Sequence, residues 1–185
     1  AVFQSEELRS YTLMTAAASG LIAMNLIVHA GQAATFQTVT DSVFQVVTLM
    51  TTTGYMTKDY VLWPTFSQVV LILVMFAGGC AGSTAGGIKQ IRLVLLCKNL
   101  HREVQRILHP RVVKTLDSDG DRVEEATLSG ISLFFFAYIL LLLLGTLVVA
   151  WDDVGFTAAF TGALTCISNV GPAFDALGPT SNFFD

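Results

Sequence analysis

Charged residues are scarce in this sequence. Only 13% of its 185 residues are Asp, Glu, Lys or Arg, whereas soluble domains carry about 25%. Hydrophobic residues make up 53%, which excludes a disordered chain because disorder requires low hydrophobicity. The net charge of −4 argues against a protein that binds nucleic acid through bulk positive charge. A membrane protein is the class that remains.

Cysteine is also sparse. The three cysteines, Cys80, Cys97 and Cys166, form no C-x-x-C pair, so their spacing supports neither a disulfide framework nor a zinc site. Each lies in or beside an apolar stretch, and we expect all three to be small, buried packing residues. No catalytic constellation is visible either, and we expect the protein not to be an enzyme.

Three long runs of the sequence contain no charged residue: 10–40, 60–88 and 126–151. A helix needs about 20 largely apolar residues to cross the hydrocarbon core of a bilayer. We therefore predict spanning helices at 8–30 and 126–150, and a closing span that starts near Trp63. The chain begins with no signal-peptide pattern, because Glu6 and Glu7 stand where a basic region would be required.

Two shorter apolar pieces, Asp41–Thr53 and Thr157–Asn169, are too short to span and each ends in a turn containing glycine. Stretches of this length are typical of re-entrant segments. Irregular backbone at membrane depth is tolerated only inside protein or along a water-filled path. These pieces therefore predict pore helices followed by exposed backbone, with Asp41 as the N-cap of the first.

The basic residues predict the orientation in the membrane. Eight of the ten Lys and Arg residues lie between Lys89 and Arg122. Because loops rich in Lys and Arg stay on the cytoplasmic side, this segment is expected to face the cytoplasm. Both pore loops then enter the membrane from outside.

An internal repeat has an offset of 117 residues. Gly54 and Gly171 are related by it, as are Thr48 and Thr165. Glycine adopts positive φ freely, so it allows successive carbonyls to turn toward one axis, where they can replace the water around an ion. The first glycine turn is Thr51-Thr52-Thr53-Gly54-Tyr55 and the second is Ser168-Asn169-Val170-Gly171-Pro172. The hydroxyls and carbonyls of Thr51, Thr52 and Ser168 are expected to line the ion path just below the glycines.

A Gly-rich segment (residues 77–89) contains Gly78, Gly79, Gly82, Gly86 and Gly87. It fails as a phosphate-binding loop, because no strand precedes it and Ile88 separates its last glycine from Lys89. From the residues alone, helix packing through small residues and an unwound gate lined by Ser83 and Thr84 are equally plausible.

The first glycine turn looks like the filter loop of potassium channels. Together with the second turn, the Gly-rich segment and the basic stretch 89–110, it closely resembles the TrkH branch of the TrkH/KtrB-type potassium uptake proteins. The resemblance covers essentially the whole chain. The T-V-G-Y-G pattern of true potassium channels occurs in neither turn, which favours weaker discrimination between potassium and sodium.

The resemblance implies an all-α polytopic membrane protein of repeated span–pore loop–span units with a Gly-rich broken helix. Two units are expected: a third-type unit at 1–110 (span 8–30, pore helix and filter 41–56, broken closing span 63–109) and a fourth-type unit at 126–185 (span 126–150, pore helix and filter 156–173). A cytoplasmic hairpin at 111–125 joins them, with expected strands at Arg111–Leu116 and Asp121–Glu125. The second unit lacks its closing span, which predicts a piece of a longer polypeptide.

The resemblance also implies a function. It assigns a gate to the Gly-rich segment and predicts potassium uptake through the bacterial inner membrane, with no cofactor, as a homodimer regulated by a cytosolic nucleotide-binding subunit of the TrkA type. The filter residues are expected to be Thr51, Thr52, Thr53, Gly54, Tyr55, Ser168, Asn169, Val170 and Gly171, with K+ at Thr52, Thr53, Asn169 and Val170. The gate residues are expected to be Gly78, Gly79, Gly82, Ser83, Thr84, Gly86 and Gly87.

An ion-coupled secondary transporter is the alternative, because re-entrant hairpins and Gly-broken helices also build such carriers. Coupled carriers usually place ionisable side chains within the membrane. The three uncharged runs contain no Asp, Glu, Lys or Arg, which favours the pore.

Overall fold

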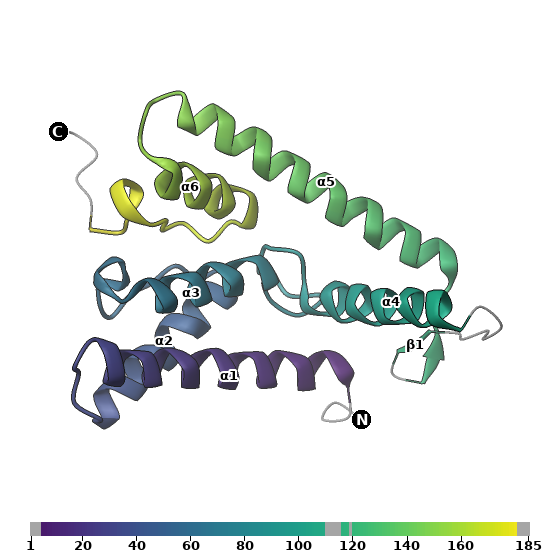
Figure 1. The fold of residues 1–185 in the computed structure, drawn as a ribbon, viewed down its shortest axis with the longest axis horizontal. Helices are drawn as coiled ribbons and strands as arrows, with labels where there is room; N and C mark the ends of the chain where they lie inside the picture. Colours follow the sequence, from purple (N-terminus) through teal and green to yellow (C-terminus); the bar gives the residue numbers. More distant parts are fainter. Residues whose placement is uncertain (1–4, 110–115, 119, 181–185) are drawn as a thin grey trace.

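The computed structural model describes residues 5–109, 116–118 and 120–180 of the chain. Its longest helices are α1 (Glu6–His29) and α5 (Glu125–Ala150). Two shorter helices, α2 (Phe36–Met50) and α6 (Phe156–Ser168), each follow one of them and pack against it. The helix α3 (Thr65–Ala77) lies between α1 and α6, and α4 (Gln90–Leu108) extends beyond it at one end of the molecule (Figure 1).

Two helices, α1 and α5, are long and apolar enough to cross a membrane, and α3 and α6 are apolar but shorter. Many large apolar side chains of α1 and α5 are exposed, including Leu13, Val28, Leu133 and Leu147. A water-soluble surface rarely carries so much contiguous apolar area. In a bilayer the same side chains are in an apolar solvent, so their exposure agrees with a polytopic membrane protein.

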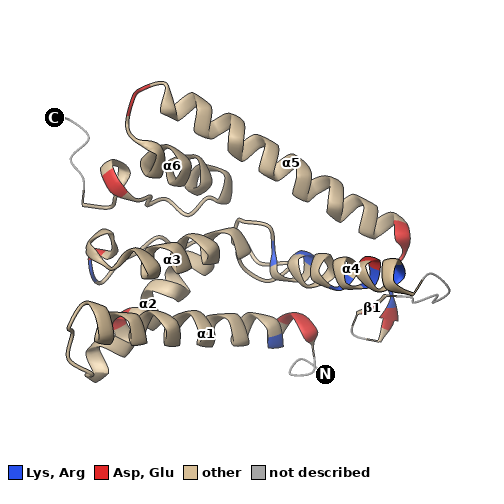
Figure 2. Cartoon of the chain, in the orientation of Figure 1, with Lys and Arg blue, Asp and Glu red and all other residues tan. Residues whose placement is uncertain are grey.

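The basic residues gather at one end of this structure. Figure 2 shows Lys and Arg concentrated along α4 and near the two short strands, at the end where α1 and α5 begin. At the opposite end stands Lys58, the one basic residue between the first two uncharged runs, 10–40 and 60–88. This polarity follows from the sequence order, and it fits a cytoplasmic end at α4.

The core joins the two halves of the chain. One cluster of buried side chains includes Ile22 of α1, Leu49 of α2, Met75 of α3, Leu142 of α5 and Leu164 of α6. The ring of Tyr60, in the short helix η2 (Tyr60–Leu62), packs edge-on against Phe174 with centroids 4.8 Å apart. The Tyr60 hydroxyl also donates to the Ala173 carbonyl at 2.9 Å. Phe174 precedes the last short helix, η3 (Asp175–Leu177).

The first short helix begins earlier than its sequence predicts. We expected it to start at Asp41, but α2 starts at Phe36, and its N-cap is Thr35, whose side chain accepts a hydrogen bond from the Thr38 N–H. The N-cap assignment of Asp41 is therefore wrong. Residues 36–40 contain no glycine or proline to stop the helix, so it continues back to the next residue able to cap it. The buried Asp41 carboxylate accepts from Gln37 and Thr57 instead.

Two further expectations need correction. The strands are only β1 (Asp117–Ser118) and β2 (Asp121–Arg122), paired antiparallel around a turn at Gly120. The expected strand 111–116 lies outside the described residues except for Leu116. The second strand stops at Arg122, before Glu124, the N-cap position of α5. Cys97 and Cys166 are exposed and Cys80 is half-buried. They are not buried packing residues, because the helix faces that carry Cys97 and Cys166 face outward.

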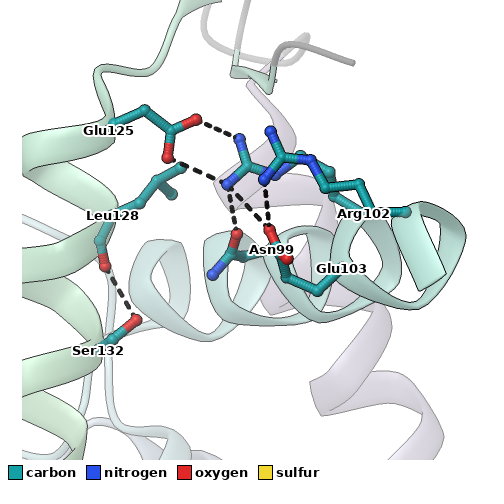
Figure 3. A network of polar contacts seen from close by, with 7 residues as sticks. Asn99, Arg102, Glu103, Glu125, Leu128 and Ser132 are labelled. Atoms are coloured by element: carbon teal, nitrogen blue, oxygen red, sulfur yellow. Dashed lines mark hydrogen bonds and ion pairs between the residues drawn. The ribbon is translucent and has the colours of Figure 1, made fainter. Parts of the chain in front are cut away.

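A polar network fixes α4 against the start of α5. The Arg102 side chain, only 5% exposed, donates to both carboxylate oxygens of Glu125 at 2.6 and 3.1 Å and to Asn99 Oδ1 at 2.8 Å (Figure 3). Hydrogen bonding to Glu125 raises the pKa of Arg102, although burial acts in the opposite direction. A two-oxygen contact of this kind fixes the angle between the two helices as well as their distance.

We expect Arg102→Met to lower the melting temperature of the full-length protein in detergent by about 2–4 °C. The substitution keeps the buried aliphatic stem but removes the donors, so Glu125 and Asn99 lose their partner. Arg106→Met is the matched control, because the Arg106 side chain is 42% exposed and pairs with Glu103 on its own helix. Equal melting temperatures for wild type and Arg102→Met would contradict a structural role for this network.

Candidate functional site

The first glycine turn begins where α2 ends. Thr51 caps the helix, and the chain then takes positive φ at Thr52 (55°) and Gly54 (79°). The Thr53 N–H donates back to the Thr48 carbonyl at 2.8 Å, and the Thr52 N–H donates to the Leu49 carbonyl at 3.3 Å. Left-handed backbone at a threonine is costly. These hydrogen bonds therefore hold a strained turn against the helix end.

The second glycine turn has the same backbone plan. Asn169 has φ 54° and Gly171 has φ 105°. The Val170 N–H donates to the Thr165 carbonyl at 3.0 Å, and the Asn169 N–H donates to the Cys166 carbonyl at 3.4 Å. Every one of these positions lies 117 residues after its counterpart (169 − 52 and 165 − 48, for example). The repeat therefore extends from residue types to backbone conformation.

The two turns lie against each other. A methyl group added to Gly54 would lie 2.4 Å from the Val170 carbonyl oxygen and 3.1 Å from Pro172 Cδ. Only a residue without a side chain leaves room for this approach. The structure thus brings together two turns that are separated by more than 100 residues in the sequence.

The hydroxyl groups of the turns are engaged with protein atoms. Thr51 Oγ1 donates to the Val47 carbonyl at 2.7 Å, and Ser168 Oγ lies 2.7 Å from the hydroxyl of buried Tyr138. Thr52 Oγ1 accepts the Gly86 N–H at 3.2 Å. Each of these three hydroxyl groups therefore has a protein partner. The C-terminal ends of α2 and α6, which precede the turns, add partial negative charge there.

The Gly-rich segment is non-helical between Ala77, where α3 ends, and Gln90, where α4 begins. Helix packing through Gly78, Gly82 and Gly86 is therefore excluded as its role. The base of this loop is tightly closed: a methyl group on Gly78 would lie 2.2 Å from the Gly86 carbonyl oxygen. The Ile88 N–H donates to Phe76 O and the Gln90 N–H to Gly79 O, both at 3.1 Å.

The Gly-rich segment lies directly against both glycine turns. Besides the hydrogen bond from the Gly86 N–H to Thr52, a methyl group on Gly86 would lie only 1.8 Å from the Ser168 carbonyl oxygen. The Lys89 ammonium group is folded back into the loop, where it donates to the carbonyls of Ser83 (2.8 Å) and Ala85. One short piece of backbone thus touches the ends of α2 and α6 together.

Only some of the predicted site residues take part in the contact between the two glycine turns and the Gly-rich segment. Contacts join Gly54 to Val170 and Gly86 to both Thr52 and Ser168, whereas the Tyr55 side chain is 73% exposed. Sequence reasoning missed Tyr60 and Tyr138, whose hydroxyl groups contact the Ala173 carbonyl and Ser168 Oγ at the second turn. An aromatic residue before an apolar run is too common a pattern to identify such a contact.

Comparison with known proteins places these features in a family. A family profile described as "TrkH: Cation transport protein" matches residues 8–183. The chain is 35% identical over 144 residues to the Trk system potassium uptake protein TrkH of Escherichia coli K12, covering 78% of this chain and 30% of that protein. It is 36% identical over 135 residues to TrkG of the same organism, covering 73% of this chain and 28% of TrkG.

A solved structure agrees. The crystal structure of the potassium transporter TrkH from Vibrio parahaemolyticus superimposes with a TM-score of 0.85 at 31% identity, over 96% of this chain and 37% of that one. The chain thus spans about a third of the length of the relatives it matches.

Proposed function

This chain belongs to the TrkH family of cation transport proteins, and from that premise we propose that it forms two of the units around a potassium-conducting pore. The supporting observation is the meeting of three backbone segments: the two glycine turns and the Gly-rich segment that lies against both. In this proposal the carbonyls of the turns select the ion. The residues that bind K+ are Thr52, Thr53, Asn169 and Val170.

The Gly-rich segment is the gate in this proposal. Its contact with Ser168 brings the backbone at Gly86 against the turns, and the Lys89 ammonium group lies within the same segment, on the carbonyls of Ser83 and Ala85. A cation leaving the turns toward α4 would meet both. Movement of this loop away from the turns would open the path, and its glycines at Gly78, Gly82 and Gly87, all with positive φ, give it the required freedom.

The membrane, the oligomeric state and the regulatory partner are proposed from membership of the family. We propose a bacterial inner membrane with the basic helix α4 on the cytoplasmic side, a homodimer, and a nucleotide-binding regulatory subunit of the TrkA type that contacts α4. The supporting feature is the clustering of Lys and Arg at that end of the molecule (Figure 2). These partners would act on the helix that directly continues the Gly-rich segment.

Rubidium uptake into vesicles that contain the full-length protein tests the pore against a coupled carrier. We expect uptake to follow the membrane potential, to be inhibited by potassium at least about tenfold more effectively than by sodium, and to persist without any proton or sodium gradient. Vesicles without the protein are the control. Uptake that requires a sodium or proton gradient would favour the secondary transporter.

A further inference from the structure

Glu7, in the first turn of α1, bonds both to the Gly-rich segment and to the start of α4. Its Oε1 accepts the N–H of Ala81, inside the segment, at 2.6 Å. The same oxygen accepts the N–H of Ile91, the second residue of α4, at 3.3 Å. These partners are 74 and 84 residues away in the sequence. A single carboxylate oxygen therefore joins the span, the loop and the helix that follows the loop.

The contact with Ile91 completes the start of α4. A helix leaves its first four N–H groups without intrahelical partners. Lys89, at the N-cap position, makes no side-chain cap. The Gln90 N–H donates to Gly79, the N–H groups of Arg92 and Leu93 donate to the Lys89 carbonyl, and the Ile91 N–H goes to Glu7. Glu7 thus supplies the cap from another helix, with the negative charge that a helix N-terminus favours.

We propose that Glu7 is a positioning residue that holds the Gly-rich segment against the glycine turns. The inference rests on the proposed gating function. Ala81 lies in the half of the segment that follows α3, and Ile91 is the second residue of α4, the helix that the other half enters. Holding both to one oxygen fixes the loop at the cytoplasmic end, while the Gly86 N–H bound to Thr52 fixes it at the turns.

The neighbouring residue offers a matched control. Glu6 lies in the same helical turn but pairs with Lys98, in the middle of α4, and its side chain is 37% exposed. Replacing Glu6 perturbs the charge and helix propensity of this turn, yet leaves the hydrogen bonds from Ala81 and Ile91 to Glu7 in place.

Cys80, in the Gly-rich segment, provides a readout of loop position that does not depend on transport. We would measure alkylation of Cys80 by N-ethylmaleimide in the full-length protein, resolved by peptide mass spectrometry, with exposed Cys97 as an internal standard. We expect Glu7→Ala to raise the Cys80 rate about tenfold, the change expected from loss of the charge-assisted hydrogen bond to neighbouring Ala81. Glu7→Gln keeps a neutral acceptor and should raise it about threefold. Glu6→Ala should leave it unchanged.

Rubidium uptake by the same variants separates the two proposals. Faster alkylation with uptake at least about threefold higher in the absence of regulator supports both. Faster alkylation with unchanged uptake supports the role of Glu7 and overturns the gate. The role of Glu7 is overturned if the Cys80 rate is unchanged in Glu7→Ala and Glu7→Gln. It is also overturned if both variants raise the rate equally, because both remove the carboxylate charge, which by itself favours the reactive thiolate. An equal increase in Glu6→Ala also overturns it, because the whole turn would then have loosened.

Discussion

Gly54→Ser is expected to abolish selective uptake. At φ 79°, a residue with a side chain is strained by about 1–2 kcal/mol. Its Cβ would also lie 2.4 Å from the Val170 carbonyl oxygen, which must then turn away. Because that carbonyl belongs to the proposed filter, rubidium uptake by the full-length protein should fall at least about tenfold. Potassium should no longer compete better than sodium for whatever flux remains.

Two substitutions separate the causes of that loss. Gly171→Ser imposes left-handed strain at the equivalent position, φ 105°, but no described atom lies within 4 Å of the added Cβ. It should reduce uptake less than Gly54→Ser does. Gly20→Ser, in the middle of α1 and open on its exposed side, should have no effect on selectivity. Normal selectivity in Gly54→Ser would rule out Gly54 as part of the filter.

Gly86→Ala is expected to displace the Gly-rich segment. Gly86 is not among the residues with positive φ, so its constraint is space alone. The added methyl group would lie 1.8 Å from the Ser168 carbonyl oxygen, and backbone atoms cannot yield to that extent without moving the loop. The Gly86 N–H would then separate from Thr52. Uptake without regulator should rise several-fold while potassium remains preferred over sodium.

Competition by sodium identifies which side of this contact moves. If Gly86→Ala loses selectivity as well, the end of α6 at Ser168 has shifted instead of the loop. Gly82→Ala is the control, because it adds left-handed strain at φ 76° in open space. Uptake equal to wild type in Gly86→Ala would mean that the Gly-rich segment does not obstruct the path.

Hydrophobicity determined most of the helical framework. The spans expected at 8–30 and 126–150 agree with α1 and α5 to within two residues. Runs of apolar residues without charge allow few other conformations in a bilayer, because every backbone polar group must be satisfied within the segment. The start of α2 was predicted wrongly because more than one residue near it can act as the N-cap. Asp41 is a good N-cap by residue type, but Thr35 takes the N-cap position six residues earlier in the sequence.

The glycine turns were predictable for a related reason. A glycine after a short apolar helix marks backbone that ordinary residues cannot form, and the offset of 117 residues identifies Gly54 and Gly171 as a pair. Positive φ at Thr52 and Asn169 was not predictable. Threonine disfavours that conformation, and only the hydrogen bonds to the end of the helix impose it.

The sequence by itself determined the membrane class, the spans, the direction of the charge bias and the paired glycine turns, because each depends on residue type and local spacing. Only the tertiary structure decided which backbone atoms meet: Gly54 with Val170, Gly86 with Ser168, and Glu7 with the Gly-rich segment. Such contacts depend on how whole helices pack. No local sequence pattern encodes these contacts, because each residue would suit its own helix or turn equally well if the helices packed differently.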